Sequence, residues 1–233
     1  MNKKYLLLLL IGLTLLLTSF FIKGERVKQT KLEEEIKENF KDETIESDQF
    51  EIDFDSLIEV NADVIGWINI NNTDVDYPVL KTNNNDFYLD RNIYKEKASH
   101  GSIFMDFRNI GDGTDRHTII YGHQMDDGTM FTSLNNFKDE NFLNNNKTFK
   151  LMLLNEVHTY EIFSAYVTDT SFYYIMTNFR TDDSFLSYVN KLKNKSYFNS
   201  DIVLNKNDKI LTLSTCSYEF DNARFVIHAK KLN

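Results

Sequence analysis

The pattern of apolar and polar positions first separates a short N-terminal segment from the rest of the chain. Residues 5–22 form an almost unbroken apolar run behind a basic tip at residues 1–4. The run is long enough for a short membrane-spanning helix, and no small-residue cleavage pattern follows it. We therefore expect an uncleaved transmembrane anchor at 5–22, with a cleaved signal peptide as the alternative. Both interpretations place residues 51–233 on the extracellular face of a cell membrane.

Residues 23–50 are rich in charge and connect this apolar run to the remainder of the chain. Leu32, Ile36 and Phe40 recur at four-residue spacing, which indicates that part of the segment is helical. We expect a solvated stalk, and the alternative is a helix that packs on the folded domain.

From residue 51 onward the pattern changes to short runs of β-branched and aromatic residues separated by Asn, Asp and Gly. Such runs predict strands, here at 64–70, 74–80, 101–105, 117–123, 148–154, 157–168, 209–216 and 224–230. Helical spacing predicts short helices at 54–58, ending near Asn61, at 130–137 and at 183–192, the last behind the possible caps Thr181 and Asp182. Many strands with a few helices favour a mainly β fold, either a closed barrel or a sandwich with helical additions.

The composition of the chain excludes several classes of partner and of site. The 233 residues carry a formal net charge of −9, which argues against a nucleic-acid partner. One cysteine excludes an intramolecular disulfide framework and a zinc site made of several thiolates. Acidic residues lie at Asp106, Asp112, Asp115, Asp126 and Asp127 without the spacing of a calcium loop. We therefore expect solvated turns there, and neither a metal nor a cofactor.

The single cysteine, Cys216, ends the run 209–216, in which Thr212, Ser214 and Cys216 share one face. If this run pairs antiparallel with the run that begins at Arg224, the guanidinium faces the thiol and favours the thiolate. His123 ends an earlier run and opens a loop, which makes it the candidate base; the other four histidines fit the surface or the core better. Taken alone, such a cysteine is more often a small buried side chain than a nucleophile.

The segment Thr212-Leu213-Ser214-Thr215-Cys216, with Arg224 eight residues later and Tyr121-Gly122-His123 upstream, resembles the sortases. Sortases are membrane-anchored cysteine transpeptidases of Gram-positive bacteria. Other segments that share the resemblance are 61–68, 75–79 and 101–106. The N-terminal helical extension and the insert with the helix at 183–192 resemble class B members. The resemblance implies a closed eight-stranded sortase barrel with N-terminal helices and a helix in the insert before the cysteine strand.

The resemblance also implies a reaction. Cys216 attacks the carbonyl of a threonine in a C-terminal sorting signal of an exported protein and forms a thioester, which an amine of a peptidoglycan precursor resolves. His123 serves as general acid and base, and Arg224 stabilises the oxyanion. Class B members are associated with signals of the Asn-Pro-x-Thr type and with variants that end in Thr-Gly, and the sequence does not choose between them. The nominated substrate-binding residues are Ser214, Thr215 and Tyr174.

Two alternatives stay open at this point. One is a cysteine protease that hydrolyses the same type of signal, since it shares the acyl-enzyme and differs only in the group that resolves it. The other is a non-catalytic, anchored cell-surface binding domain in which Cys216 is a core residue.

Overall fold

The computed structural model describes residues 3–42, 51–154 and 156–232. Its helices are α1 (Lys3–Phe40), α2 (Phe54–Val60), α3 (Glu140–Asn145) and α4 (Asp182–Asn194), with short 3-10 helices η1 (Phe87–Leu89) and η2 (Thr132–Lys138). Strands β1 (Lys41–Asp42) and β2 (Glu51–Ile52) form a small sheet of their own. The remaining strands are β3 (Val64–Asn69), β4 (Asp76–Leu80), β5 (Phe104–Met105), β6 (His117–Tyr121), β7 (Thr148–Leu153), β8 (Glu156–Thr168), β9 (Ile210–Cys216) and β10 (Arg224–Lys231).

These eight strands close into a barrel in the order β10-β8-β7-β3-β4-β5-β6-β9, with β9 paired to β10. The pairs β4–β5 and β6–β9 are parallel, and the others are antiparallel. The expected mainly β barrel with helical additions is therefore confirmed, and each predicted run overlaps one barrel strand. β5 is shorter than the predicted run because Gly101 has a φ of +59° and the Ser102 N–H bonds to the Tyr88 carbonyl, at 3.0 Å.

The helices agree with the sequence less closely. α2 ends at Val60 with Asn61 as its C-cap, and Thr181 caps α4 through a hydrogen bond from the Ser184 N–H. Asp182 is the first residue of α4 and not its cap. The segment predicted at 130–137 is the 3-10 helix η2, and neither α3 nor η1 was predicted.

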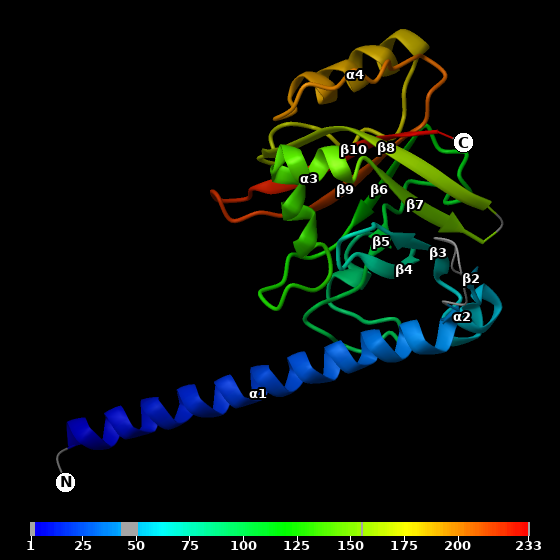
Figure 1. Cartoon of the computed structure of the whole chain (residues 1–233). Helices are drawn as coiled ribbons and strands as arrows, with labels where there is room; N and C mark the ends of the chain where they lie inside the picture. The colour runs from blue at the N-terminus through cyan, green and yellow to red at the C-terminus, as the bar shows by residue number, and fades with distance from the viewer. Residues whose placement is uncertain (1–2, 43–50, 155, 233) are drawn as a thin grey trace.

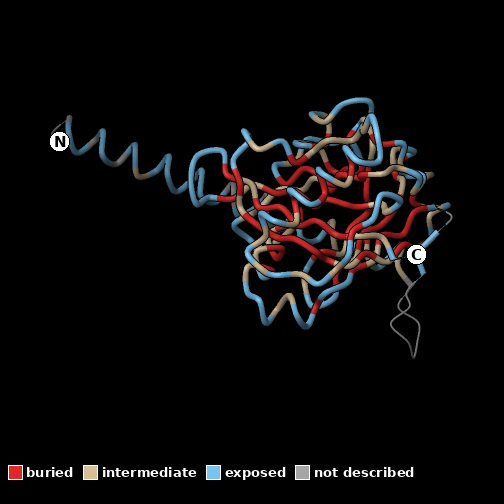
Figure 2. The backbone as a smooth tube through the Cα atoms, turned by 90° about the horizontal axis from the view of Figure 1, so that it is seen from above, coloured by how far each residue is buried: buried red, intermediate tan, exposed pale blue. Residues whose placement is uncertain are grey.

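Side chains alternate between the two faces of each strand, so that one set fills the interior of the barrel and the other lies on its outside. Ile68, Ile120 and Leu213 are fully buried in the central apolar cluster. On the outside, α4 lays Phe185 and Val189 against the residues of β8 and β10 that point outward. Figure 1 shows α4 and α1 on opposite sides of the barrel, and Figure 2 shows the buried backbone concentrated in the interior of the domain.

α1 is one continuous helix whose two halves differ. Ile36, only 6% exposed, packs with Leu32 and Phe40 on an apolar cluster that contains Trp67. The Tyr77 hydroxyl donates to Glu33 Oε2 at 3.3 Å. This half of α1 therefore packs on the domain, as in the alternative to a free stalk; residues 43–50 of the expected stalk lie outside the described residues.

The N-terminal half of α1 extends beyond the domain (Figure 2). Many of its large apolar side chains are exposed. Among the described residues, no helix contains a stretch that is long and apolar enough to cross a membrane. The expected transmembrane anchor at 5–22 is thus not supported by the structure.

Candidate active site

The strands of the barrel bring Arg224 opposite Cys216. β9 and β10 pair antiparallel, and Arg224 is the register partner of Cys216. A bond of 3.0 Å from the Ser217 N–H to the Ala223 carbonyl closes the connecting loop at its base. The first residue of one strand therefore faces the last residue of the other, as the alternation predicted.

His123 reaches the same place through a strand that is distant in sequence. β6 runs parallel to β9 with Tyr121 level with Ser214, so the position two residues beyond Tyr121 is level with Cys216. Gly122 permits this approach, because a Cβ atom there would lie 2.4 Å from Ile103 Cδ1 and 2.7 Å from the Phe131 ring. The structure thus brings His123, Cys216 and Arg224 together.

The hydrogen bonds of His123 set its orientation. Nε2 lies 2.7 Å from the Leu89 carbonyl, which can only accept, so Nε2 carries a proton. This leaves Nδ1 for the interaction with the Cys216 thiol. Leu89, in η1, was not recognised from the sequence as part of the site.

Cys216 and His123 change each other's protonation in opposite directions. The hydrogen bond with His123 lowers the pKa of the Cys216 thiol, burial opposes this, and the charge of Arg224 lowers that pKa further. The hydrogen bond with Cys216 raises the pKa of His123, although burial opposes this change too. Ordinary thiol and imidazole pKa values, about 8.5 and 6.5, make the ion pair a minority state. Both shifts therefore favour thiolate and imidazolium, the reactive pair.

These shifts predict the pH dependence of thiol reactivity. We expect the rate at which iodoacetamide alkylates Cys216 to rise with pH through an inflection below about 8.5, because the thiolate is the nucleophile. Arg224→Ala removes one cause of the lowered pKa, so the inflection moves to higher pH. The matched variant Arg180→Ala, at an exposed arginine, leaves it in place. Alkylation is followed by mass spectrometry, and an inflection at or above pH 8.5 in the unchanged chain would contradict the geometry.

A pocket of about 260 Å³ opens beside the thiol, and all the predicted site residues line it. The Tyr174 hydroxyl lies 2.9 Å from Ser214 Oγ, so these two side chains form one wall. Thr215 is only 2% exposed and alternates to the other face of β9 from Cys216. The full lining is Asn85, Asp86, Leu89, Phe104, Tyr121, Gly122, His123, Tyr174, Ser214, Thr215, Cys216 and Arg224.

Behind this pocket lies Asp106, for which the predicted solvated turn is wrong. Its side chain is fully buried and accepts from Arg108 Nε and Nη2, each at 2.7 Å, and from the Tyr121 hydroxyl at 2.8 Å. Asn85 Nδ2 donates to it at 3.1 Å. Burial alone would raise the pKa of Asp106, but the hydrogen bonds from Arg108 and Tyr121 bring that pKa below its ordinary value. Asp106 therefore holds two side chains that line the pocket, those of Asn85 and Tyr121, from behind.

Asp106→Asn is expected to lower the free energy of unfolding by about 2–4 kcal/mol, because it leaves Arg108 without its buried countercharge. Urea denaturation of the full chain measures this change. The control Asp183→Asn, at an exposed position in the first turn of α4, should change stability by less than about 1 kcal/mol. Equal stability of the two variants would show that the buried carboxylate contributes nothing.

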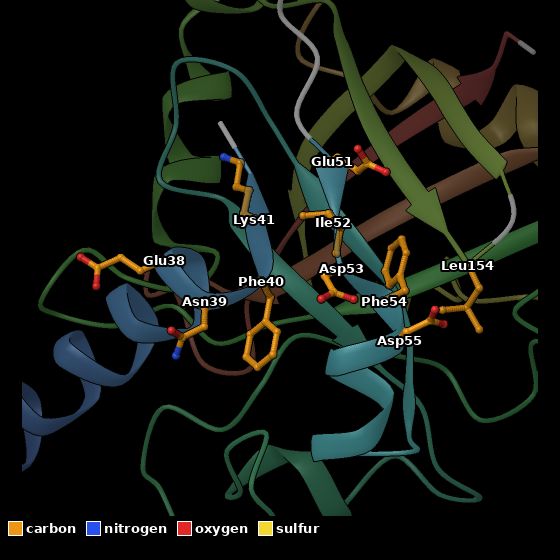
Figure 3. A pocket seen from close by; sticks show the side chains of 10 residues that line it. All are labelled: Glu38, Asn39, Phe40, Lys41, Glu51, Ile52, Asp53, Phe54, Asp55 and Leu154. Carbon is orange, nitrogen blue, oxygen red and sulfur yellow. The ribbon is translucent and has the colours of Figure 1, made fainter. Parts of the chain in front are cut away.

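A larger cavity, of about 680 Å³, lies away from the thiol (Figure 3). None of the described residues that line it is a cysteine, serine or histidine, and Asp53 in its wall is engaged in capping α2. Its lining consists of Glu38, Asn39, Phe40, Lys41, Glu51, Ile52, Asp53, Phe54, Asp55 and Leu154. The candidate reactive groups, Cys216 and His123, therefore line the smaller pocket.

Within the described part of the chain, no group of three or more His, Cys, Asp or Glu side chains is arranged to hold a metal ion. The absence of a metal and of a cofactor stays a prediction of the sequence.

Comparison with known proteins agrees with this barrel. The family model of the sortase domain matches residues 68–232. Sortase B of Listeria monocytogenes is 42% identical over 176 residues, which cover 75% of this chain and 72% of the relative. Sortase B of Staphylococcus aureus is 37% identical over 179 residues, which cover 76% and 73%. The crystal structure of sortase B from Bacillus anthracis superposes with a TM-score of 0.79 at 35% identity, covering 89% of this chain and 98% of that one.

The thiol, the imidazole and the guanidinium at one end of this barrel, together with these matches, define the class: the chain belongs to the sortase family of cysteine transpeptidases. Within the family it is most similar to sortase B, as the N-terminal helix and the α4 insert suggested. The non-catalytic binding domain is thereby excluded.

Proposed function

We propose that the chain cleaves a C-terminal sorting signal after threonine and joins the exported protein to an amine of a peptidoglycan precursor. The observation that carries this proposal is the hydrogen-bonded Cys216–His123 pair beside Arg224 in a pocket with a polar wall. The structure of one related protein, sortase B of Staphylococcus aureus, has been solved as a substrate complex, at 36% identity to this chain and with a TM-score of 0.73. Class B resemblance favours a signal of the Asn-Pro-x-Thr type.

In the first half of the proposed reaction, the Cys216 thiolate attacks the carbonyl carbon of the threonine. The carbonyl π electrons move onto oxygen, and the guanidinium of Arg224 stabilises this oxyanion. When the tetrahedral intermediate collapses, the C–N bond breaks and the His123 imidazolium gives its proton to the departing amine. A thioester on Cys216 and a neutral His123 remain.

In the second half, the incoming amine attacks the thioester carbonyl and loses a proton to His123. The C–S bond then breaks, which returns the thiolate and the imidazolium and leaves a new amide. Water in place of the amine gives hydrolysis, so the protease alternative differs only in this second step. Ser214 and Tyr174 are proposed to bind the signal along the pocket wall, and Thr215, whose side chain lies on the other face of β9, is proposed to do so through its backbone.

The choice between amine and water is tested by product mass. The full chain is incubated with an Asn-Pro-x-Thr peptide, with and without an amine such as diaminopimelate or a short glycine peptide. A product that contains the amine supports transpeptidation. Free threonyl acid as the only product at every amine concentration would support the protease instead.

Attachment to a membrane is a separate part of the proposal. It is supported by the exposed apolar side chains of α1, among them Leu7, Leu8, Leu16 and Phe20, each at least 59% exposed. We expect the expressed full chain to sediment with membranes, while Leu8→Glu/Leu16→Glu reduces the bound fraction. Alkaline carbonate extraction then separates a spanning segment, which stays bound, from a peripheral one. A full chain found entirely in the soluble fraction would overturn attachment by this segment.

A further inference from the structure

Two histidines outside the pocket, His117 on β6 and His228 on β10, are fully buried under the α4 insert. Thr212 of β9 lies between them, with its hydroxyl 2.6 Å from His117 Nε2 and 2.6 Å from His228 Nδ1. His228 Nε2 lies 2.9 Å from the Tyr166 hydroxyl. At the other end, His117 Nδ1 lies 2.7 Å from the carbonyl of Met176.

The Met176 carbonyl fixes the donor and the acceptor of each hydrogen bond in this series. A carbonyl only accepts, so His117 Nδ1 carries the proton and its Nε2 accepts from the Thr212 hydroxyl. Having donated its one proton, Thr212 accepts from His228 Nδ1–H, and His228 Nε2 accepts from Tyr166. Burial lowers the pKa of both imidazoles, that of His117 to about 4, which agrees with neutral rings.

This series of hydrogen bonds ends on the segment 169–181, which connects β8 to α4 and contains neither helix nor strand. Both backbone groups of Met176 are held, since its N–H bonds to the Tyr188 hydroxyl of α4 at 3.2 Å. Two residues earlier, Tyr174 reaches Ser214 in the pocket wall. The position of this wall therefore depends on where the Met176 carbonyl is held.

Packing alone does not explain why the buried positions 117 and 228 carry imidazole rings. Burial of two polar rings costs desolvation, which only satisfied hydrogen bonds offset, and an apolar side chain would fill the same space without that cost. What the His117 ring adds is a single donor, aimed at a backbone carbonyl of an irregular segment that lacks a ladder partner.

We propose that His117 is a positioning residue of the sortase reaction: through the Met176 carbonyl it holds the segment that carries Tyr174, and so sets the affinity for the sorting signal. Thr212 and His228 keep His117 in the tautomer that donates to Met176. His117 touches none of the reacting groups. The inference rests on the proposed function of the same pocket.

The test is a KM-against-kcat comparison on the full chain with an Asn-Pro-x-Thr peptide. His117→Phe keeps a ring of similar shape and removes the donor to Met176. We expect KM to rise about tenfold with kcat within about threefold, and the pH profile of Cys216 alkylation to stay unchanged. His117→Asn, whose amide can donate from near the Nδ1 position, should restore KM to within about threefold. The matched control His158→Phe, at a buried histidine outside the pocket lining, should leave both constants unchanged.

An unchanged KM in a folded His117→Phe variant overturns the inference, as does an equal rise of KM in His158→Phe. A loss confined to kcat, or an altered alkylation profile, also overturns it, because His117 would then act on the reacting groups. If His117→Phe does not fold, Thr212→Val decides: a raised KM at constant kcat supports the inference, and an unchanged KM overturns it. Failure of the proposed function itself is distinct, since the unchanged chain would then not turn over the peptide.

Discussion

Cys216→Ala is expected to lower kcat/KM for a sorting-signal peptide by about 10⁴-fold or more, because the variant has no group that can form the acyl-enzyme. The thiol is half-buried at the end of β9, so truncation leaves the strand ladder with β10 intact. Turnover is measured by liquid chromatography of the cleaved peptide. The melting temperature of the variant should match that of the unchanged chain.

Cys216→Ser is the matched variant for this prediction. It keeps a nucleophilic atom in nearly the same position, but a hydroxyl lacks the lowered pKa that His123 and Arg224 give the thiol. Its activity should therefore lie close to that of Cys216→Ala. Full activity in Cys216→Ala would place the nucleophile elsewhere and contradict the mechanism.

His123→Ala carries the second largest expected effect, a loss of about 10³-fold in kcat/KM. In the proposed mechanism, the change removes both the acid that protonates the leaving amine and the base that activates the incoming one. It also removes the hydrogen bond that is the main cause of the lowered pKa of Cys216, so the alkylation inflection moves to higher pH. Steady-state kinetics and the alkylation profile measure the two effects separately.

The control for this variant is His158→Ala, which removes a buried imidazole that does not line the pocket. It should retain kcat/KM within about threefold even where it lowers stability. A His123→Ala variant with kcat/KM within tenfold of the unchanged chain would mean that another group moves the proton.

The barrel could be predicted from the chain because alternation is a local property. Runs such as 209–216 and 224–230 display their inner and outer faces residue by residue, and the short connection of 217–223 implies the hairpin that sets Arg224 opposite Cys216. The nearness of His123 to Cys216 is different. It depends on the parallel pairing of β6 with β9, which are separated by about ninety residues, and alternation says nothing about such a pairing. The place of His123 at the end of a run made it the candidate base, and the family resemblance was needed to pair it with Cys216.

The errors have the same physical origin. Asp106 looked like a turn carboxylate because its three partners, Asn85, Arg108 and Tyr121, meet only in the folded barrel. The one local signal was Arg108 two residues after Asp106, directly behind the apolar run 103–105. In the same way, the four-residue spacing of Leu32, Ile36 and Phe40 predicted a helix but not what it packs on, since the apolar cluster beneath it is gathered from many segments, α2, β3, β4 and β7 among them.

The central claim is a covalent thioester on Cys216, and intact-protein mass spectrometry of the full chain tests it most directly. The chain is incubated with a panel of candidate signal peptides, quenched in acid and digested to locate any adduct. The account predicts a mass gain equal to the acyl group of the peptide up to and including its threonine (the free acid less one water), carried on the fragment that contains Cys216 and removed by hydroxylamine. Cleavage of a peptide with no adduct under these conditions, or an adduct on any other residue, would contradict it.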